Sequence, residues 1–582
     1  MGVIMNEKPV KIEIKGKMRD TIEVLMADGT IISGPRNMQV GEFMKVYQDP
    51  AKPLIVGAIV DQSLRELTHI LKADAHVSPI DMSDTDGARI YRRSLVFLLE
   101  VAFLELFSDW TLTIDHSVSS GAYYCHVPEQ EPFTKLDLNR LEARMREIVG
   151  ADEPLVKEKV ALDEAKAFFK KKRQFDKLRL LNYRTVDDLV LYDLHGIRDY
   201  HHGYMVPSTG YLQWFDLRLV GSGFVLRFPR RHAPSKLSPM PSYPQLLTAF
   251  RQYSEWLETL GIQSVGALND AISDGRINEV ILVSEALHEQ QISRIANTIR
   301  KKKDQIRVIL IAGPSSSGKT TFSKRLTIQL LTEGISPFAL EMDNYFVNRE
   351  DTPKDENGHY DFEHIDALNR EMMNEHIKRL IKGERVQLRH YNFIKGINEP
   401  GEEVQFDPGQ MIILEGIHGL NPKLLEAIPL EQTYRIYVSC LTQLNLDRHN
   451  RISTTDTREL RRILRDSRDR GYTAQQTIGH WEMVRRGEKA HIFPYQEHAD
   501  IMFNSALAYE LTVLKPLVEP LLRQVPYGTP EHIEAKRLLK FLQWFLPIDA
   551  GLIPDNSILR EFVGGSILKD FKIWLHKSSN SY

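Results

Sequence analysis

Short apolar runs that end at glycine or at a carboxylate dominate the second half of the chain. Residues 308–312 are all apolar, and a glycine- and serine-rich stretch and then a helix-like pattern follow them. Residues 337–342, apolar except for Glu341, and 411–414 are further short runs, and a carboxylate comes directly after each. Such runs, alternating with helical patterns, are typical of parallel strands in an α/β fold. We therefore expect an α/β multidomain protein with a doubly wound parallel sheet in its second half.

The first half has a different pattern of short strands, turns and helices. The strands that we expect first are 11–15, 22–25 and 54–58, with a turn at Asp28-Gly29. We expect an apolar helix over 91–107, a charged helix over 136–172, and mainly helical structure over 242–305 and 506–582. A linker rich in proline and serine covers 233–242. The pattern predicts five units, which are 1–73, 74–232, 233–305, 306–505 and 506–582.

Composition narrows the class of protein but not its function. The chain has 582 residues, of which 42% are hydrophobic and 26% charged, as in folded domains. Its formal net charge of −3 argues against a general affinity for nucleic acid or membranes. Two cysteines, Cys125 and Cys440, exclude a disulfide framework or a cysteine-rich zinc site. Because no signal peptide or membrane span is visible, we expect a cytoplasmic protein with no membrane partner.

The glycine-rich stretch after residues 308–312 has the spacing of a phosphate-binding loop. Its residues, continued by the first turn of the helix, are Gly313, Pro314, Ser315, Ser316, Ser317, Gly318, Lys319, Thr320 and Thr321. In such a loop the backbone N–H groups face one anion, and the helix N-terminus adds partial positive charge. We expect Lys319 to reach the terminal phosphates of ATP and the Thr320 hydroxyl to bind Mg²⁺. The loop by itself does not show what happens to the phosphate.

Two carboxylates and a group of arginines follow the loop at positions that suit phosphoryl transfer. Asp343 ends a predicted strand, where it is either a general base or an ordinary turn or cap residue. Glu415 also ends a strand, where it either binds Mg²⁺, directly or through water, or is an ordinary solvated residue at the strand end. Arg458, Arg462 and Arg465 share one face of a helix. That face is either a mobile lid over the phosphates or simply a solvated surface.

These motifs, in this order, resemble those of the uridine kinase/phosphoribulokinase family of P-loop kinases. The matching stretches after the loop are 343–346, 361–367, 391–393, 415–417 and 461–466. The resemblance implies that Asp343 is the catalytic base, that Glu415 and Thr320 serve the metal, and that Lys319 assists transfer. It implies that Arg462, Arg465 and Arg470 cover the phosphates. The substrate-binding positions that it implies are Tyr345, Phe362, Glu363, Tyr391, Phe393 and His480.

The same comparison shows departures at the acceptor end. Glu363 stands where uridine kinases have the shorter acid that holds the ribose. Gly396 stands where they have the histidine that reads the pyrimidine, and His480 stands at a glutamine position after the lid. Loss of a buried polar side chain that hydrogen-bonds the base relaxes selectivity for the acceptor, because those hydrogen bonds distinguish one base from another. Phosphotransfer is therefore better indicated than uridine as the acceptor.

The first half resembles two modules of threonyl-tRNA synthetases. Residues 9–73 are similar to the β-grasp TGS domain, and residues 74–230 to the α+β editing domain. The four editing positions align with Arg93, Phe97, His201 and Met205, so we expect no editing activity, because Phe97 and Met205 cannot carry protons. His195, His201 and His202 form a local cluster that is either a metal site or a set of surface and capping residues.

We expect an ATP- and Mg²⁺-dependent kinase of a uridine- or cytidine-like nucleoside or a related small alcohol. One alternative keeps the kinase and changes the acceptor to a sugar phosphate or a pantothenate-like alcohol. Another is a nucleotide-dependent regulatory protein that contacts RNA through its N-terminal modules. We also expect a homo-oligomer. Residues 553–565 are either an ordered segment docked on another domain or a helix cap and loop.

Overall fold

The computed structural model describes residues 19–118, 121–127, 133–354, 358–393, 395–407 and 409–571. The strand expected over 11–15 lies outside these residues. The first described residues form a mixed sheet in the order β2-β1-β5-β3-β4, packed against one helix. Its elements are β1 (Thr21–Met26), β2 (Ile31–Pro35), α1 (Val40–Tyr47), β3 (Ile55–Val60), β4 (Ser63–Arg65) and β5 (Ala75–Asp81). In β1, alternate residues are buried, as expected for a strand with one face on a core.

A long buried helix, α2 (Thr85–Leu106), leads into the next part of the chain, which has two small antiparallel sheets. One sheet has the order β10-β9-β8 and the other β11-β12-β7-β6. The strands are β6 (Thr113–Val118), β7 (Ala122–His126), β8 (Val156–Ala161), β9 (Asp188–Leu194), β10 (Ile197–Asp199), β11 (Asp216–Val220) and β12 (Gly223–Arg227). The helices here are α3 (Lys135–Ala151), α4 (Leu162–Lys171) and α5 (Phe175–Asn182).

The prediction of a single charged helix over 136–172 is wrong. Helix α3 ends where Asp152 adopts a left-handed conformation with φ of 49°, and strand β8 then separates α3 from α4. In β8 the sequence Val-Lys-Glu-Lys-Val-Ala pairs along its whole length with β9. The charged residues of β8 led to the wrong prediction. A strand at the edge of a sheet exposes charged side chains to solvent, and so does a helix on the surface.

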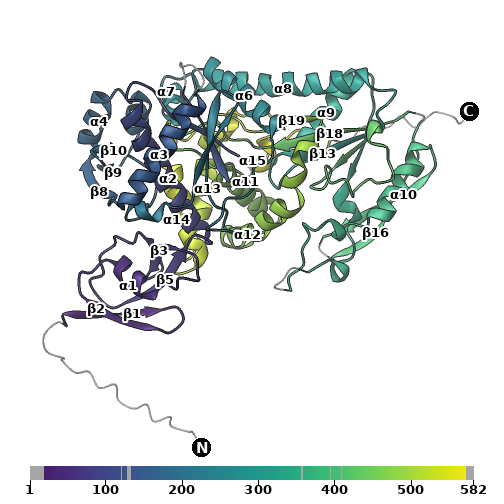
Figure 1. Ribbon diagram of the computed structural model, residues 1–582. Helices are drawn as coiled ribbons and strands as arrows, with labels where there is room; N and C mark the ends of the chain where they lie inside the picture. Colours follow the sequence, from purple (N-terminus) through teal and green to yellow (C-terminus); the bar gives the residue numbers. More distant parts are fainter. Residues whose placement is uncertain are drawn as a thin grey trace, which may run out of the picture.

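The parallel sheet of the second half has the order β14-β17-β13-β18-β19, which confirms the expected α/β class. Its strands are β13 (Val308–Ala312), β14 (Phe338–Glu341), β17 (Ile412–Glu415), β18 (Thr433–Ser439) and β19 (Ile501–Asn504). All five residues of β13 are buried, as in a central strand covered on both faces. A separate hairpin of β15 (Val386–Asn392) and β16 (Ile397–Val404) lies beside α10 (Arg370–Ile381), at the lower right of Figure 1.

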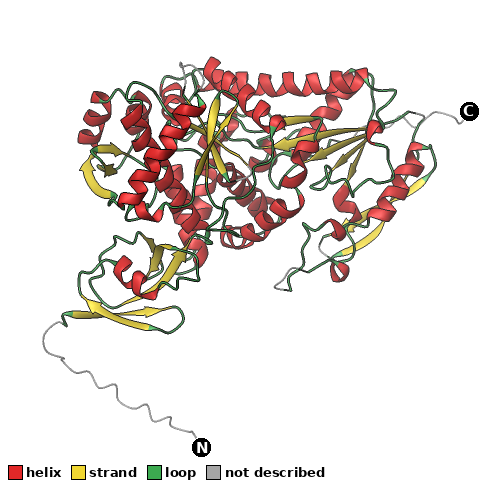
Figure 2. Ribbon diagram, in the orientation of Figure 1, coloured by secondary structure: helices red, strands yellow, loops and turns green. Residues whose placement is uncertain are grey.

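Helices join the two halves. Helices α6 (Pro244–Thr259), α7 (Val265–Ser273) and α8 (Ile277–Lys301) link them, and α8 runs along the top of the molecule to α9 (Lys319–Thr332) (Figure 1). The last helices lie between the sheets, as the red ribbons in the centre of Figure 2 show. They are α11 (Thr454–Asp469), α12 (Ala474–His491), α13 (Glu510–Leu522), α14 (Pro530–Leu542) and α15 (Arg560–Val563). One hydrophobic cluster runs from Val160 to Phe562 and so includes residues of both halves.

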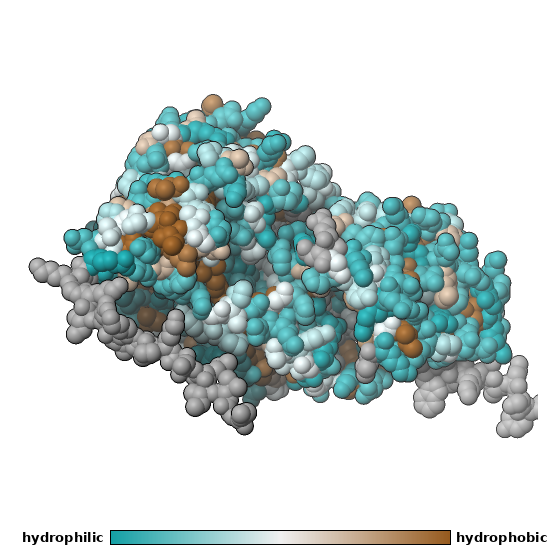
Figure 3. Space-filling model, turned by 90° about the horizontal axis from the view of Figure 1, so that it is seen from below, coloured by the Kyte–Doolittle hydropathy of each residue, from teal (hydrophilic) through white to brown (hydrophobic). Residues whose placement is uncertain are grey.

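The surface is mainly hydrophilic where Figure 3 shows it, with hydrophobic side chains gathered in a few places, chiefly on the left of that view. Among the described residues, no helix has both the length and the apolar character needed to cross a bilayer.

Candidate active site

The glycine-rich loop lies between β13 and α9, at the carboxyl edge of the parallel sheet. Gly318 has a φ of +85°, a left-handed conformation that favours glycine. A side chain at Gly313 would lie 2.0 Å from the carbonyl oxygen of Val438, so only glycine lets the loop pass this close to β18. Lys319 begins α9, and its Nζ lies 3.4 Å from the carbonyl oxygen of Pro314. Strand, loop and helix therefore have the arrangement that presents backbone N–H groups to an anion.

Thr320 and Glu415 offer two oxygens side by side below the loop. The Thr320 hydroxyl donates to Oε2 of Glu415 at 3.1 Å, and Lys319 Nζ lies 4.0 Å from Oε1. Burial raises the pKa of Glu415 to about 7, although the charge of Lys319 opposes this shift. In an octahedral Mg²⁺ site, adjacent oxygens are about 3 Å apart. The pair therefore fits two neighbouring ligands of Mg²⁺, and a cation there would favour the ionised form of Glu415.

Asp343 lies in a short 3₁₀ turn, Met342–Tyr345, directly after β14. Its side chain is accessible to solvent, but the surrounding protein partly desolvates the carboxylate and raises its pKa. Lys319, Arg470 and Arg465 oppose the rise, so all three cations lie within electrostatic reach of the carboxylate. Asp343 also acts on the pKa of Glu415, which places the two acids in one site. The strand order explains this, because β14 and β17 are neighbours and end at the same edge.

A single buried carboxylate, Asp466, holds the three arginines that were expected over the phosphates. It accepts from Arg462 Nε at 3.1 Å and from Arg465 Nη2 at 3.2 Å, and lies 3.4 Å from Arg470 Nη1. Arg462 also donates to the side chain of Ser315 in the loop, at 2.8 Å. Because one acid serves three guanidinium groups, positive charge remains for an anion at the loop.

The helix that carries these arginines is firmly packed, which does not fit the expectation of a hinged lid. Nine of the 16 residues of α11 are buried, and the helix contacts α12, α13 and α15. Arg461, next to Arg462, is fully buried and donates to both carboxylate oxygens of Glu510, at 3.0 and 2.6 Å. In this structure α11 is therefore a fixed wall of the site.

Glu488 of α12 is a residue of the site that the sequence did not indicate. Its Oε1 accepts the backbone N–H of Ser315 at 3.2 Å and the guanidinium of Arg458, and its Oε2 accepts from Arg485 at 2.9 Å. Burial by itself would raise the pKa of Glu488, but Arg458 and Arg485 lower it. No local motif could have revealed this acid, because it lies 173 residues from Ser315 in the chain.

The C-terminal segment also reaches the loop. Oε2 of Glu561 accepts the backbone N–H of Thr321 at 3.1 Å and its hydroxyl at 2.9 Å. A side chain at Gly318 would lie 2.5 Å from Cγ2 of Ile558, so this segment packs directly on the loop. Arg468 of α11 holds the segment through the carbonyl oxygens of Glu561 and Phe562, each at 2.9 Å. Of the two readings of residues 553–565, the structure shows the docked segment.

The residues expected to bind the acceptor divide into two groups. Phe362, Tyr391 and Phe393 surround Phe346, with ring centroids between 5.5 and 6.4 Å from it. Glu363, next to Phe362, packs against Gly487 and lies near Lys319 and Arg462; burial raises its pKa to about 7. The structure does not bring the other two expected residues to this group. The ring of Tyr345 is buried against His376, and that of His480 is exposed beside Tyr472.

Arg349 occupies the space beside Gly396. Its guanidinium carbon lies 2.9 Å from where a side chain at Gly396 would begin, and its Nη2 donates to the carbonyl oxygen of Phe393 at 2.7 Å. Its charge lowers the pKa of Tyr391, although burial raises that pKa overall. A cation therefore lies beside Gly396, the position at which this chain lacks the pyrimidine-reading histidine expected of a uridine kinase.

The residues at the editing positions lie together in the first half. The rings of Phe97 and His201 are in edge contact at 5.2 Å, Met205 is buried, and Arg93 donates to the carbonyl oxygen of Tyr204 at 2.6 Å. This leaves His201 as the one imidazole among the four positions.

The three clustered histidines have separate partners. His195 lies between Glu105 and Glu153, at 2.6 and 2.7 Å. His201 faces Glu100, whereas Nδ1 of His202 lies 3.1 Å from the hydroxyl of Tyr200. Glu100, Asp199 and His201 lie close enough to hold a metal ion, but Lys177 and His449 already bind these two acids. The cluster is therefore a set of ion pairs and hydrogen bonds.

Comparison with known proteins finds different relatives for the two parts of the chain. Residues 308–511 match the family described as phosphoribulokinase/uridine kinase. A threonine–tRNA ligase of Acidovorax sp. (strain JS42) is 34% identical over 175 residues, which are 30% of this chain and 27% of that protein. The enzyme of Burkholderia ambifaria is 30% identical over 204 residues, 35% of this chain and 32% of that protein. The chain thus spans about a third or less of these relatives.

Among solved structures, one described as a possible uridine kinase from Bacillus stearothermophilus aligns with 36% of this chain and 100% of that chain. Its sequence identity is 17% and its TM-score 0.24. By sequence, the chain joins an N-terminal part similar to threonine–tRNA ligases to a C-terminal segment that matches the phosphoribulokinase/uridine kinase family.

Proposed function

We propose that the protein transfers the γ-phosphate of ATP to a hydroxyl group of a small alcohol, with Mg²⁺ as cofactor. The observation that carries this proposal is the grouping of Asp343, Lys319 and the Thr320–Glu415 pair below one phosphate-binding loop. A base, a cation for the migrating phosphoryl group and a metal site are the parts that this reaction needs.

Each residue of the site has a separate role in the proposed phosphoryl transfer. Thr320 and Glu415 hold Mg²⁺, which neutralises charge on the phosphates when it is bound. Lys319 binds the terminal phosphates, and Arg465 and Arg470 stabilise negative charge on the group being transferred. Asp343 accepts the proton of the acceptor hydroxyl as its oxygen attacks in line. The cations around Asp343 favour its ionised form, which the proton transfer requires.

The acceptor is a uridine- or cytidine-like nucleoside or a related alcohol. The aromatic group around Phe346 supports a planar or apolar portion of the acceptor, and Glu363 supports hydrogen bonds to its hydroxyls. Arg349 favours a second candidate, an acceptor that carries an acidic group such as a sugar phosphate, because guanidinium binds phosphate and carboxylate well.

A product screen tests the proposal. Nucleosides, sugar phosphates and hydroxy acids are incubated with ATP and Mg²⁺, and phosphorylated products are detected by mass spectrometry. We expect one class of acceptor to gain a phosphate in the wild type. ATP hydrolysis with no phosphorylated product from any class would contradict the proposal and favour a nucleotide-dependent regulatory protein, which tight RNA binding would then support.

A further inference from the structure

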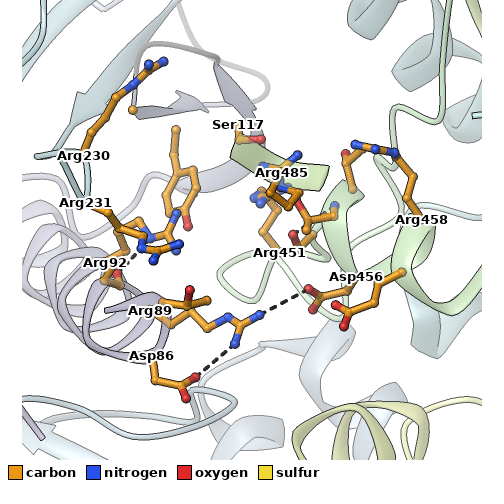
Figure 4. Close-up of a pocket in the computed structure, with 18 of the residues that line it drawn as sticks. Asp86, Arg89, Arg92, Ser117, Arg230, Arg231, Arg451, Asp456, Arg458 and Arg485 are labelled. Atoms are coloured by element: carbon orange, nitrogen blue, oxygen red, sulfur yellow. Dashed lines mark hydrogen bonds and ion pairs between the residues drawn. The ribbon is translucent and has the colours of Figure 1, made fainter. Parts of the chain in front are cut away.

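A cavity of about 900 Å³ lies between the synthetase-like part and the kinase part. Arginines from both sides line it (Figure 4): Arg92, Arg230 and Arg231 from the first half, and Arg451, Arg458 and Arg485 from the second. Its volume is within the range of pockets that bind small molecules. Asp343 does not line this cavity, but Arg458 and Arg485 connect the cavity to Ser315 and Glu488 of the site described above.

Acids neutralise the arginines at one end of the cavity. There Arg89 pairs with Asp86 and Glu534 at 3.0 and 2.7 Å, and Arg537 pairs with Asp456 at 2.7 Å. Figure 4 shows Asp86, Arg89 and Asp456 together at the bottom of the view, away from Arg230 and Arg485.

Three of the other arginines that line the cavity are also ion-paired: Arg231 with Glu482 at 2.7 Å, and Arg458 and Arg485 with Glu488. Five further cations of the cavity have no acidic partner among the described residues. No carboxylate in the described part of the chain forms an ion pair with Arg92, Arg93, Arg230, Arg451 or Lys489. Arg92 donates from Nε to the carbonyl oxygen of Ala88, and Arg451 from Nη1 to that of Ile452, at 2.9 and 2.7 Å. Nε of Arg451 is buried and has no hydrogen-bond partner among the described residues.

The local chemistry also indicates an excess of positive charge. Burial alone would raise the pKa of the Tyr123 phenol, but Arg92 and Arg451 lower it below its ordinary value. Burial together with Arg485, Arg231 and Arg230 lowers the pKa of Lys489 to about 8, although Glu482 opposes this. Unpaired cations in a sheltered site are costly, and an anion relieves that cost.

We propose that this cavity binds a small ligand with two or more phosphate groups. A terminal phosphate carries a charge of about −1.5 to −2 at neutral pH, so a ligand with two or three phosphates has enough negative charge to match the unpaired cations. Guanidinium groups bind phosphate oxygens in pairs, which suits arginines that converge from two sides. A longer RNA backbone needs a broad basic surface, whereas this chain has a net charge of −3 and the cations without acidic partners line a single cavity.

Binding of tripolyphosphate, measured by isothermal titration calorimetry without Mg²⁺, tests this proposal. The background carries Lys319→Ala, so that the phosphate loop does not compete. We expect one molecule to bind per chain, and the further change Arg92→Gln or Arg451→Gln to weaken binding by at least about tenfold. Arg251→Gln is the matched control, since Arg251 is exposed and lies outside the cavity.

Thermal unfolding distinguishes a ligand-binding arginine from a structural one. Without ligand, Arg92→Gln should unfold at the same temperature as the background or at a higher one, because it removes an unpaired charge. Tripolyphosphate should raise the melting temperature of the background and of Arg251→Gln, but not that of Arg92→Gln. Three results would overturn the proposal: no binding, equal binding by all variants, or a melting temperature that Arg92→Gln lowers strongly. Binding only of an RNA 3′ end would overturn the assignment to a small ligand.

Discussion

Replacement of Glu561 by glutamine should tighten ATP binding. The carboxylate of Glu561 now accepts the N–H and the hydroxyl of Thr321, in the first turn of α9 after the phosphate loop. Backbone N–H groups at this position of a phosphate-binding loop face the phosphates of a nucleotide. ATP must therefore displace the carboxylate or bind beside it, and either event costs free energy.

The size of the effect follows from these two hydrogen bonds. A hydrogen bond to a charged group contributes about 1.5–3 kcal/mol, and a neutral one about 0.5–1.5 kcal/mol. Glutamine keeps the shape and one acceptor oxygen but removes the charge, so the competing interaction weakens by roughly 1–2 kcal/mol. Since 1.4 kcal/mol corresponds to a factor of ten, we expect the Kd for ATP to fall roughly tenfold.

Isothermal titration calorimetry with ATP and Mg²⁺ measures this change directly. Asp555→Asn is the control, because it removes an acid from the same C-terminal segment at a site that is 70% exposed. Its Kd for ATP should equal that of the wild type. An unchanged or higher Kd for Glu561→Gln would refute the reasoning, and a higher one would mean that Glu561 assists nucleotide or metal binding.

Three further predictions concern the metal pair, a buried ion pair and the junction between the halves. Glu415→Gln should raise the Mg²⁺ concentration for half-maximal activity by about ten- to a hundredfold, measured by titration of the initial rate. Arg461→Met leaves Glu510 buried and unpaired, so chemical denaturation should show a loss of about 3–5 kcal/mol. Burial would lower the pKa of His449, but Glu100 and a hydrogen bond to Asp199 raise it to about 9. The stability that its charge contributes is complete below the ordinary pKa of 6.5 and is lost as the pH rises through about 9. Melting temperatures should therefore fall over this window, and less so in His449→Gln.

The positions of the phosphate loop and of the two acids could be predicted from the sequence because each follows a short apolar run. The loop is local, and the carboxyl ends of neighbouring parallel strands meet at one edge, so Asp343 and Glu415 were placed correctly at that edge. The chemistry of these residues remains a prediction. Charged residues misled us at β8, where Lys and Glu alternate on a strand and were taken for a helix.

The contacts that complete the site could not be predicted, because they join segments far apart in the chain. Glu561 is 240 residues from Thr321, and Glu488 is 173 residues from Ser315. A helix with several arginines suggested a lid, but no pattern shows that Asp466 binds three of them or that Arg461 points into the core. The position of Arg349 over Gly396 likewise depends on the fold of the hairpin.

Acceptor-dependent formation of ADP tests the central claim most directly. With the acceptor found in the product screen, the wild type should release one ADP for each phosphorylated product. Asp343→Asn should lower kcat by about 10²- to 10⁴-fold, with a Kd for ATP within about twofold of the wild type. A variant that keeps the full kcat, or ADP formation that does not depend on any acceptor, would contradict the account.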